Sequence, residues 1–105
     1  MPTAQQILSK LVAADDELTS EYGATDNAAV RRQITICATA IEAVIMEIIR
    51  ADLHRRTRIL RSLTDELRNA TADLEQLKRS IGALTQAGQI AQKAINTLTS
   101  LVPFL

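Results

Sequence analysis

The amino-acid sequence predicts an all-α fold, a long-helix antiparallel bundle whose C-terminal half is coiled-coil-like. The chain has 105 residues, of which 47% are hydrophobic, and this composition fits a single helical domain covering residues 1–105. The chain contains three glycines and two prolines, so few of its residues favour turns between helices. Apolar residues recur at intervals of three and four from Leu60 to Val102, and such a stripe is buried only against another helix.

A first helix is expected over about residues 4–21. Thr3 and Gln6 have the spacing of a capping box, in which each side chain accepts a hydrogen bond from the other residue's backbone N–H. Apolar residues follow at helical spacing, and Gly23 is expected to end the helix.

A second helix is expected to start near residue 27, capped by Thr25 or Asp26, and to continue to about residue 82. Residues 34–49 are apolar around more than half of the helix circumference. Two neighbouring helices, or one neighbour and a second chain, must therefore cover them. The apolar stripe shifts by about one position near residues 48–53, which we interpret as a stutter inside one continuous helix.

A break is expected among residues 82–88, followed by a last helix over about residues 86–102. Gly82 and Gly88 are each unfavourable by about 1 kcal/mol relative to alanine inside a helix. The alternative is a compact three-helix bundle with a fold-back near residue 70, where the polar residues of the sequence Asn69-Ala70-Thr71 can cap and restart a helix.

The apolar stripe also predicts self-association, because a long helix leaves it without a partner inside the chain. We therefore expect a homo-oligomer in which this stripe, called the seam below, forms the contact between chains. The residues assigned to the seam are Leu60, Leu63, Leu67, Leu74, Leu77, Ile81 and Leu84.

The basic segment at residues 50–61 is the one candidate binding site. Its members are Arg50, His54, Arg55, Arg56, Arg58 and Arg61. In a continuous helix Arg50, His54 and Arg58 share a face with Arg61, and such a stripe can bind phosphates, acidic side chains or anionic lipid headgroups. The structural alternative is a solvated face balanced by nearby carboxylates, and the isoelectric point near 6.6 argues against a dedicated DNA-binding protein.

Catalytic, cofactor and metal sites are not predicted. His54 is the only histidine and Cys37 the only cysteine, and their separation does not match zinc-ligand spacing. Cys37 lies in an apolar stretch, which predicts a buried, unreactive thiol. With Tyr22 and Phe104 as the only aromatic residues, stacking platforms for bases or flat cofactors are also missing.

These features together predict a non-enzymatic, self-associating structural or adaptor module that acts through protein–protein contacts. The alternative function is an anion-binding module that uses the Arg50 to Arg61 stripe on nucleic acid or on an anionic membrane surface. The sequence has neither a signal-peptide pattern nor an apolar stretch long enough to span a membrane, so we expect a cytoplasmic protein, with signal-independent export left open.

Overall fold

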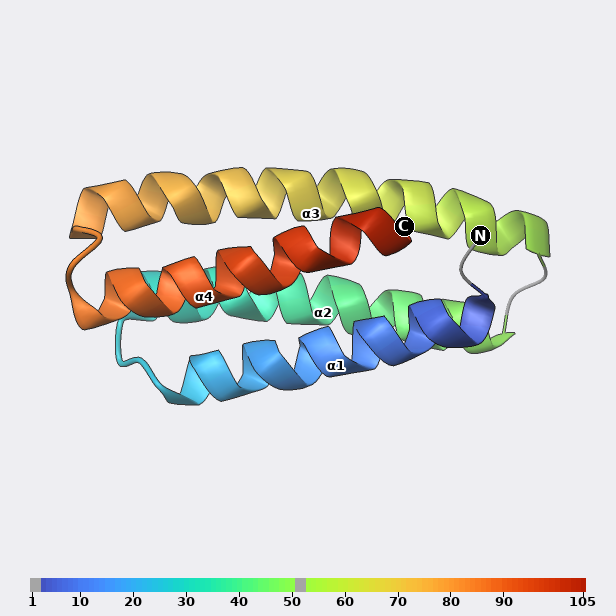
Figure 1. Cartoon of the computed structure of the whole chain (residues 1–105), viewed down its shortest axis with the longest axis horizontal. Helices are drawn as coiled ribbons and strands as arrows, with labels where there is room; N and C mark the ends of the chain where they lie inside the picture. Colours follow the sequence, from blue (N-terminus) through green and yellow to red (C-terminus); the bar gives the residue numbers. More distant parts are fainter. Residues whose placement is uncertain (1–2, 51–52) are drawn as a thin grey trace.

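In the part of the chain that the structure describes, four α-helices pack side by side into an antiparallel bundle (Figure 1). The computed structural model describes residues 3–50 and 53–105. The helices are α1 (Ala4–Gly23), α2 (Ala28–Arg50), α3 (Leu53–Ile81) and α4 (Gln86–Leu101), followed by the short 3-10 turn η1 (Val102–Phe104). Each helix packs against the one before it, and α4 also packs against α1, which closes the bundle. The all-α bundle prediction is confirmed.

Side-chain caps fix where α1 and α2 begin. Thr3 and Gln6 form the predicted capping box, with N–O distances of 2.8 and 3.2 Å. The prediction that Thr25 or Asp26 caps the second helix is wrong: the carbonyl oxygen of the Asn27 side chain accepts the backbone N–H groups of the first turn of α2 at 3.0 and 3.1 Å. Thr25 instead accepts the N–H of Asn27 at 3.1 Å, so it orders the turn before the cap.

The turn between α3 and α4 lies within the predicted break at residues 82–88. Gly82 has φ +89°, a left-handed conformation that glycine adopts without the steric cost of a Cβ. Its carbonyl oxygen accepts hydrogen bonds from the Thr85 backbone N–H at 3.2 Å and from the Thr85 hydroxyl at 2.7 Å. The same hydroxyl oxygen accepts the Gly88 N–H at 3.0 Å and thereby caps α4.

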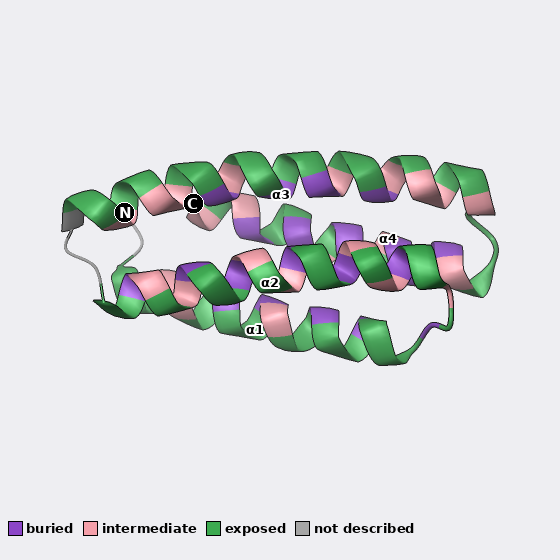
Figure 2. Ribbon diagram, turned by 180° about the vertical axis from the view of Figure 1, so that it is seen from behind, coloured by how far each residue is buried: buried purple, intermediate pink, exposed green. Residues whose placement is uncertain are grey.

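The core is aliphatic and lies along the axis of the bundle, where the inward faces of all four helices meet (Figure 2). Its largest fully buried side chains are Leu11, Leu18, Val30, Ile34, Cys37, Ile41, Leu63, Leu67, Leu74, Leu98 and Leu101. Each helix contributes residues at intervals of three and four, as expected for an amphipathic helix that buries one face.

The predicted continuous helix over residues 27–82 is wrong, because α2 and α3 are separate helices that pack against each other. The wide apolar arc of α2 explains the reversal: with α1 on one side and α3 on the other, its inward face is buried inside one chain. The alternative fold-back near residue 70 is also wrong, since α3 passes through Ala70 without interruption. Part of the expected stutter at residues 48–53 lies outside the described residues.

Candidate interaction surfaces

The predicted seam is largely covered within the chain. Leu63, Leu67 and Leu74 are buried in the core, and Leu60, Leu77 and Ile81 pack against it as partly buried residues. Leu84 is the exception, because it lies in the turn between α3 and α4 with 94% of its surface exposed. The seam is covered because α3 packs against α2 and α4 of the same chain, which a continuous second helix would not allow.

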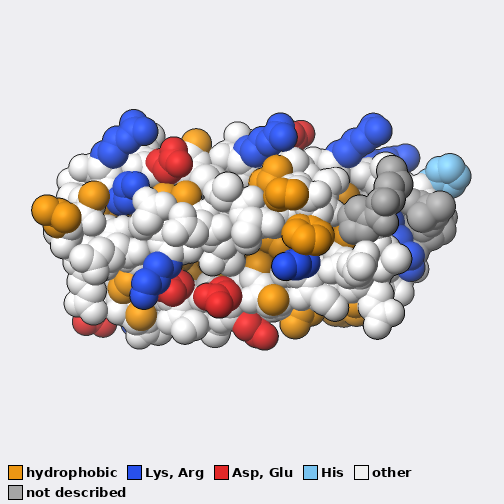
Figure 3. All heavy atoms as spheres, viewed as in Figure 1, with side chains coloured by type: hydrophobic (Ala, Val, Ile, Leu, Met, Phe, Trp, Pro, Cys, Tyr) orange, Lys and Arg blue, Asp and Glu red, His pale blue; other side chains and the backbone are white. Residues whose placement is uncertain are grey.

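The basic segment is divided between two helices. Arg50 is the last residue of α2, whereas His54 and the arginines after it belong to α3, so the prediction that Arg50 shares one helical face with them is wrong. His54, Arg58 and Arg61 are exposed and lie on one side of α3, at intervals of four and three residues. In Figure 3, lysine and arginine side chains follow the edge of the bundle formed by α3, with the histidine at one end.

Carboxylates are sparse around this part of α3. Among the described residues of the helix, none from His54 to Thr64 is acidic. Arg55 forms an ion pair with Glu47 of α2 at 3.8 Å, and both side chains are substantially exposed. An exposed ion pair at this distance contributes at most about 1 kcal/mol to stability, so the two side chains are held together only weakly. The outward line of His54, Arg58 and Arg61 is exposed, and the first carboxylate after it on α3 is Asp65, four residues beyond Arg61.

Arg56 differs from the other arginines of the segment. It lies four residues before Leu60 and seven before Leu63, so it projects from the inward side of α3, and its side chain is half-buried. Its Nε atom is shielded from solvent and has no hydrogen-bond partner. A buried donor without an acceptor is unfavourable by about 1–3 kcal/mol.

The outward face of α2 carries exposed apolar side chains. Ile36, Met46 and Ile49 expose 51%, 47% and 62% of their surfaces. The small residues Thr39 and Ala43 are also exposed on this side, between Ile36 and Met46. Ile36 and Met46 lie about 80° apart around the helix, whereas Ile49 lies about 140° from Ile36, which borders the groove toward α3. The shared outward face is therefore that of Ile36, Met46 and the small residues between them, and exposed apolar side chains on one helix face are typical of a protein–protein contact. The wide apolar arc of residues 34–49 is visible in the sequence, but the division into a covered part and this outward part depends on where α1 and α3 pack.

Reactive groups are few among the described residues. Cys37 is 1% exposed, and burial raises the pKa of its thiol to about 11, so it stays protonated at neutral pH. Burial, followed by the nearby Glu42 carboxylate, also raises the pKa of Asp15. Within residues 3–50 and 53–105, histidine, cysteine and carboxylate side chains form no cluster suited to a metal ion.

Comparison with known proteins gives no match, either to a family model, to a curated protein or to a solved structure. In the described part of the chain, none of the helices has the length and apolar character needed to cross a membrane. The proposed function therefore rests on the surfaces described above.

Proposed function

We propose that this chain is a non-enzymatic, self-associating helical module that acts in the cytoplasm as a structural or adaptor element through protein–protein contacts. The observation that carries the proposal is the exposed apolar face of α2. This face replaces the buried seam as the contact surface, and a second copy of the chain is the partner that it fits.

The spacing of residues along α2 supports pairing with a second copy. In an antiparallel pair of α2 helices, related by a two-fold axis between residues 42 and 43, Thr39 is level with Met46 of the other copy, while Ile36 and Ile49 are level on opposite flanks of the helix. The same contacts then occur twice, as two-fold symmetry requires. The small side chains of Thr39 and Ala43 near the axis allow the two helices to approach closely.

Sedimentation equilibrium or light scattering tests this proposal. The wild type should have the mass of two chains at high protein concentration, and Met46→Glu should raise the dissociation constant of the dimer by about tenfold or more, because a carboxylate enters a dry contact. Leu84→Glu is the matched control: it adds the same charge at an exposed leucine of the α3–α4 turn and should leave the dimer unchanged.

Two results would contradict the proposal. One is a wild-type mass of a single chain from micromolar to millimolar concentration. The other is equal weakening by Met46→Glu and Leu84→Glu, which would indicate a general charge effect instead of a contact at α2.

The second candidate function is polyanion binding by His54, Arg58 and Arg61, favoured by the absence of acidic residues from the described start of α3. Binding to duplex DNA, RNA or anionic vesicles should appear at about 50 mM salt and fall steeply by about 200 mM, because bound counterions are released. Reversing Arg58 and Arg61 to glutamate should abolish it, whereas Arg79→Glu, at the other end of α3, should change it little. Absence of binding to all three polyanions at low salt would exclude this function.

A further inference from the structure

One corner of the bundle is left open because α4 is much shorter than α3. The two helices have 16 and 29 residues, and at a rise of about 1.5 Å per residue α4 ends about 20 Å short of the start of α3. In Figure 1 the C-terminal end stops before the end of the bundle at which α1 and α3 begin. The turn η1 then places the last residues of the chain between these two helices.

The open corner contains an apolar groove of about 350 Å³. Ile7 of α1, Leu60 of α3 and the C-terminal residues Pro103, Phe104 and Leu105 provide most of its lining. Phe104 also forms a wall of a second hollow along α1, of about 600 Å³. The two hollows therefore meet at one aromatic side chain.

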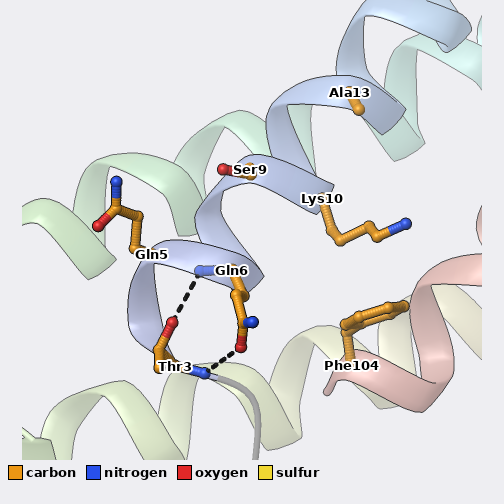
Figure 4. A pocket seen from close by; sticks show the side chains of 7 residues that line it. All are labelled: Thr3, Gln5, Gln6, Ser9, Lys10, Ala13 and Phe104. Atoms are coloured by element: carbon orange, nitrogen blue, oxygen red, sulfur yellow. Dashed lines mark hydrogen bonds between the residues drawn. The ribbon is translucent and has the colours of Figure 1, made fainter.

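Cationic groups surround this corner. Arg61 lines the apolar groove, and Lys10 lines the second hollow, where its Nζ lies 4.7 Å from the centre of the Phe104 ring (Figure 4). Among the described residues, neither hollow is lined by an aspartate or a glutamate.

We propose that the open corner binds a single-chain anionic amphiphile, such as a fatty acid. Its hydrocarbon chain lies against Ile7, Leu60 and Phe104, and its carboxylate lies toward Arg61. The groove volume falls in the range of about 300–1,000 Å³ that is common for small-molecule sites. Neither half of the site suffices alone: the apolar wall selects a hydrocarbon body, and the cations select an anionic headgroup.

This site shares Arg61 with the outward line of α3 and no residue with the exposed face of α2. Arg58, which belongs to the outward line of α3, does not line the groove, and the exposed face of α2 does not contribute to it. Arg61 belongs both to the groove and to the outward line, so variants at Arg58 and Phe104 are needed to distinguish amphiphile binding from polyanion binding.

Fluorescence of dansyl-labelled undecanoate, titrated with the full chain, tests the proposal. The signal should rise with single-site saturation, and dodecanoate should displace the probe, whereas dodecyltrimethylammonium, with the same chain and a cationic head, should not. Phe104→Ala and Arg61→Glu should each weaken binding by about tenfold. Arg58→Glu is the matched control and should bind as the wild type does, because that side chain faces away from the groove.

Three results would overturn the proposal. They are no saturable probe signal, equal displacement by the anionic and cationic amphiphiles, and wild-type affinity in both Phe104→Ala and Arg61→Glu. Binding to vesicles of phosphatidylglycerol is measured in addition. Binding to these vesicles without binding to monomeric dodecanoate would assign the cations to a membrane surface and would refute the groove. Circular dichroism of each variant, together with Arg61→Lys as a charge-preserving variant, separates loss of the site from loss of the fold.

Discussion

Replacing Gly88 with alanine should destabilise this protein, although alanine is the better helix former. A Cβ added at Gly88 would lie 2.2 Å from the carbonyl oxygen of Gly82 and 3.1 Å from both the Gly82 carbonyl carbon and the Ala83 Cα. These are backbone atoms of the α3–α4 turn, so they cannot move away as a flexible side chain would. The first turn of α4 must shift instead, and this disturbs the Thr85 hydrogen bonds that hold the turn.

Two opposing effects set the magnitude. The helix propensity of alanine stabilises the variant by about 1 kcal/mol relative to glycine. Overpacking against fixed atoms destabilises it by about 1–3 kcal/mol, and the loss of one or two capping hydrogen bonds adds about 1 kcal/mol. We therefore expect Gly88→Ala to lower the free energy of unfolding by about 1–3 kcal/mol. For a domain near this size, each 1 kcal/mol corresponds to a fall in melting temperature of about 4–8 °C.

Urea unfolding followed by circular dichroism measures this change. Gly23→Ala is the matched control, because nothing lies within 4 Å of a Cβ added at Gly23, and its stability should be equal to or higher than that of the wild type. If Gly88→Ala proved as stable as the wild type, or more so, the close approach of α4 to the Gly82 carbonyl would be refuted.

Three further predictions concern the core and its titratable groups. Cys37 should react slowly with a thiol reagent at neutral pH and rapidly after unfolding, since its pKa is about 11 and it is buried; rapid native labelling would refute this burial. The raised pKa of Asp15 means that the favourable contribution of its protonated form is present below the ordinary value of 3.8 and is lost as pH rises through the raised pKa. Asp15→Asn should therefore be more stable than the wild type at pH 7, and the difference in stability should shrink as pH falls through the raised pKa of Asp15. An unchanged or lower stability of Asp15→Asn at pH 7 would contradict the raised pKa. Leu74→Ala should lower the free energy of unfolding by about 2–5 kcal/mol without changing the mass in solution, and loss of an oligomer with little loss of stability would reinstate the seam as a contact between chains.

Local signals in the sequence were sufficient to place most helix ends. The capping box of Thr3 and Gln6 marks the start of α1, and the glycines at 82 and 88 locate the turn before α4. Such signals act over one helical turn, so the identity of a few neighbouring residues determines them. The cap of α2 shows the limit of this reasoning: Thr25, Asp26 and Asn27 all have suitable side chains, and only the path of the chain selects Asn27.

The reversal between α2 and α3 was missed because residues 50–53 contain neither glycine nor proline. The signal that was available is the shift of the apolar stripe near residues 48–53. It marks the end of one amphipathic helix and the start of another, and the same shift also fits a continuous helix with a stutter. The width of the apolar arc at residues 34–49 favoured two neighbouring helices, but it did not specify that α3 would be one of them.

The positions of the candidate surfaces depend on whether the chain reverses between α2 and α3. In a continuous helix Arg50, His54 and Arg58 share a face and the seam is open to a second chain. With the reversal, the leucines of α3 turn inward and Arg56 lies half-buried on the inward side of α3. Phe104 had no role in the sequence analysis beyond its rarity, because its position between α1 and α3 follows from the unequal lengths of α3 and α4.

The contact face on α2 and the groove at the open corner both require that α3 folds back along α2, and a distance between these helices tests that requirement most directly. Ile36 and Asn69 line the same groove between α2 and α3. Spin labels on cysteines at these two positions, in a Cys37→Ala background, report their separation by double electron–electron resonance. Labelled protein is diluted with unlabelled protein to suppress distances between chains.

The bundle predicts a short distance, within about 20 Å, because adjacent helix axes lie about 8–10 Å apart. A continuous helix would separate the two positions by about 50 Å, at about 1.5 Å per residue. A dominant distance near that longer value would contradict the fold. It would return the Leu60 to Leu84 seam to the surface and remove the structural basis for the contact face on α2 and for the groove at the open corner.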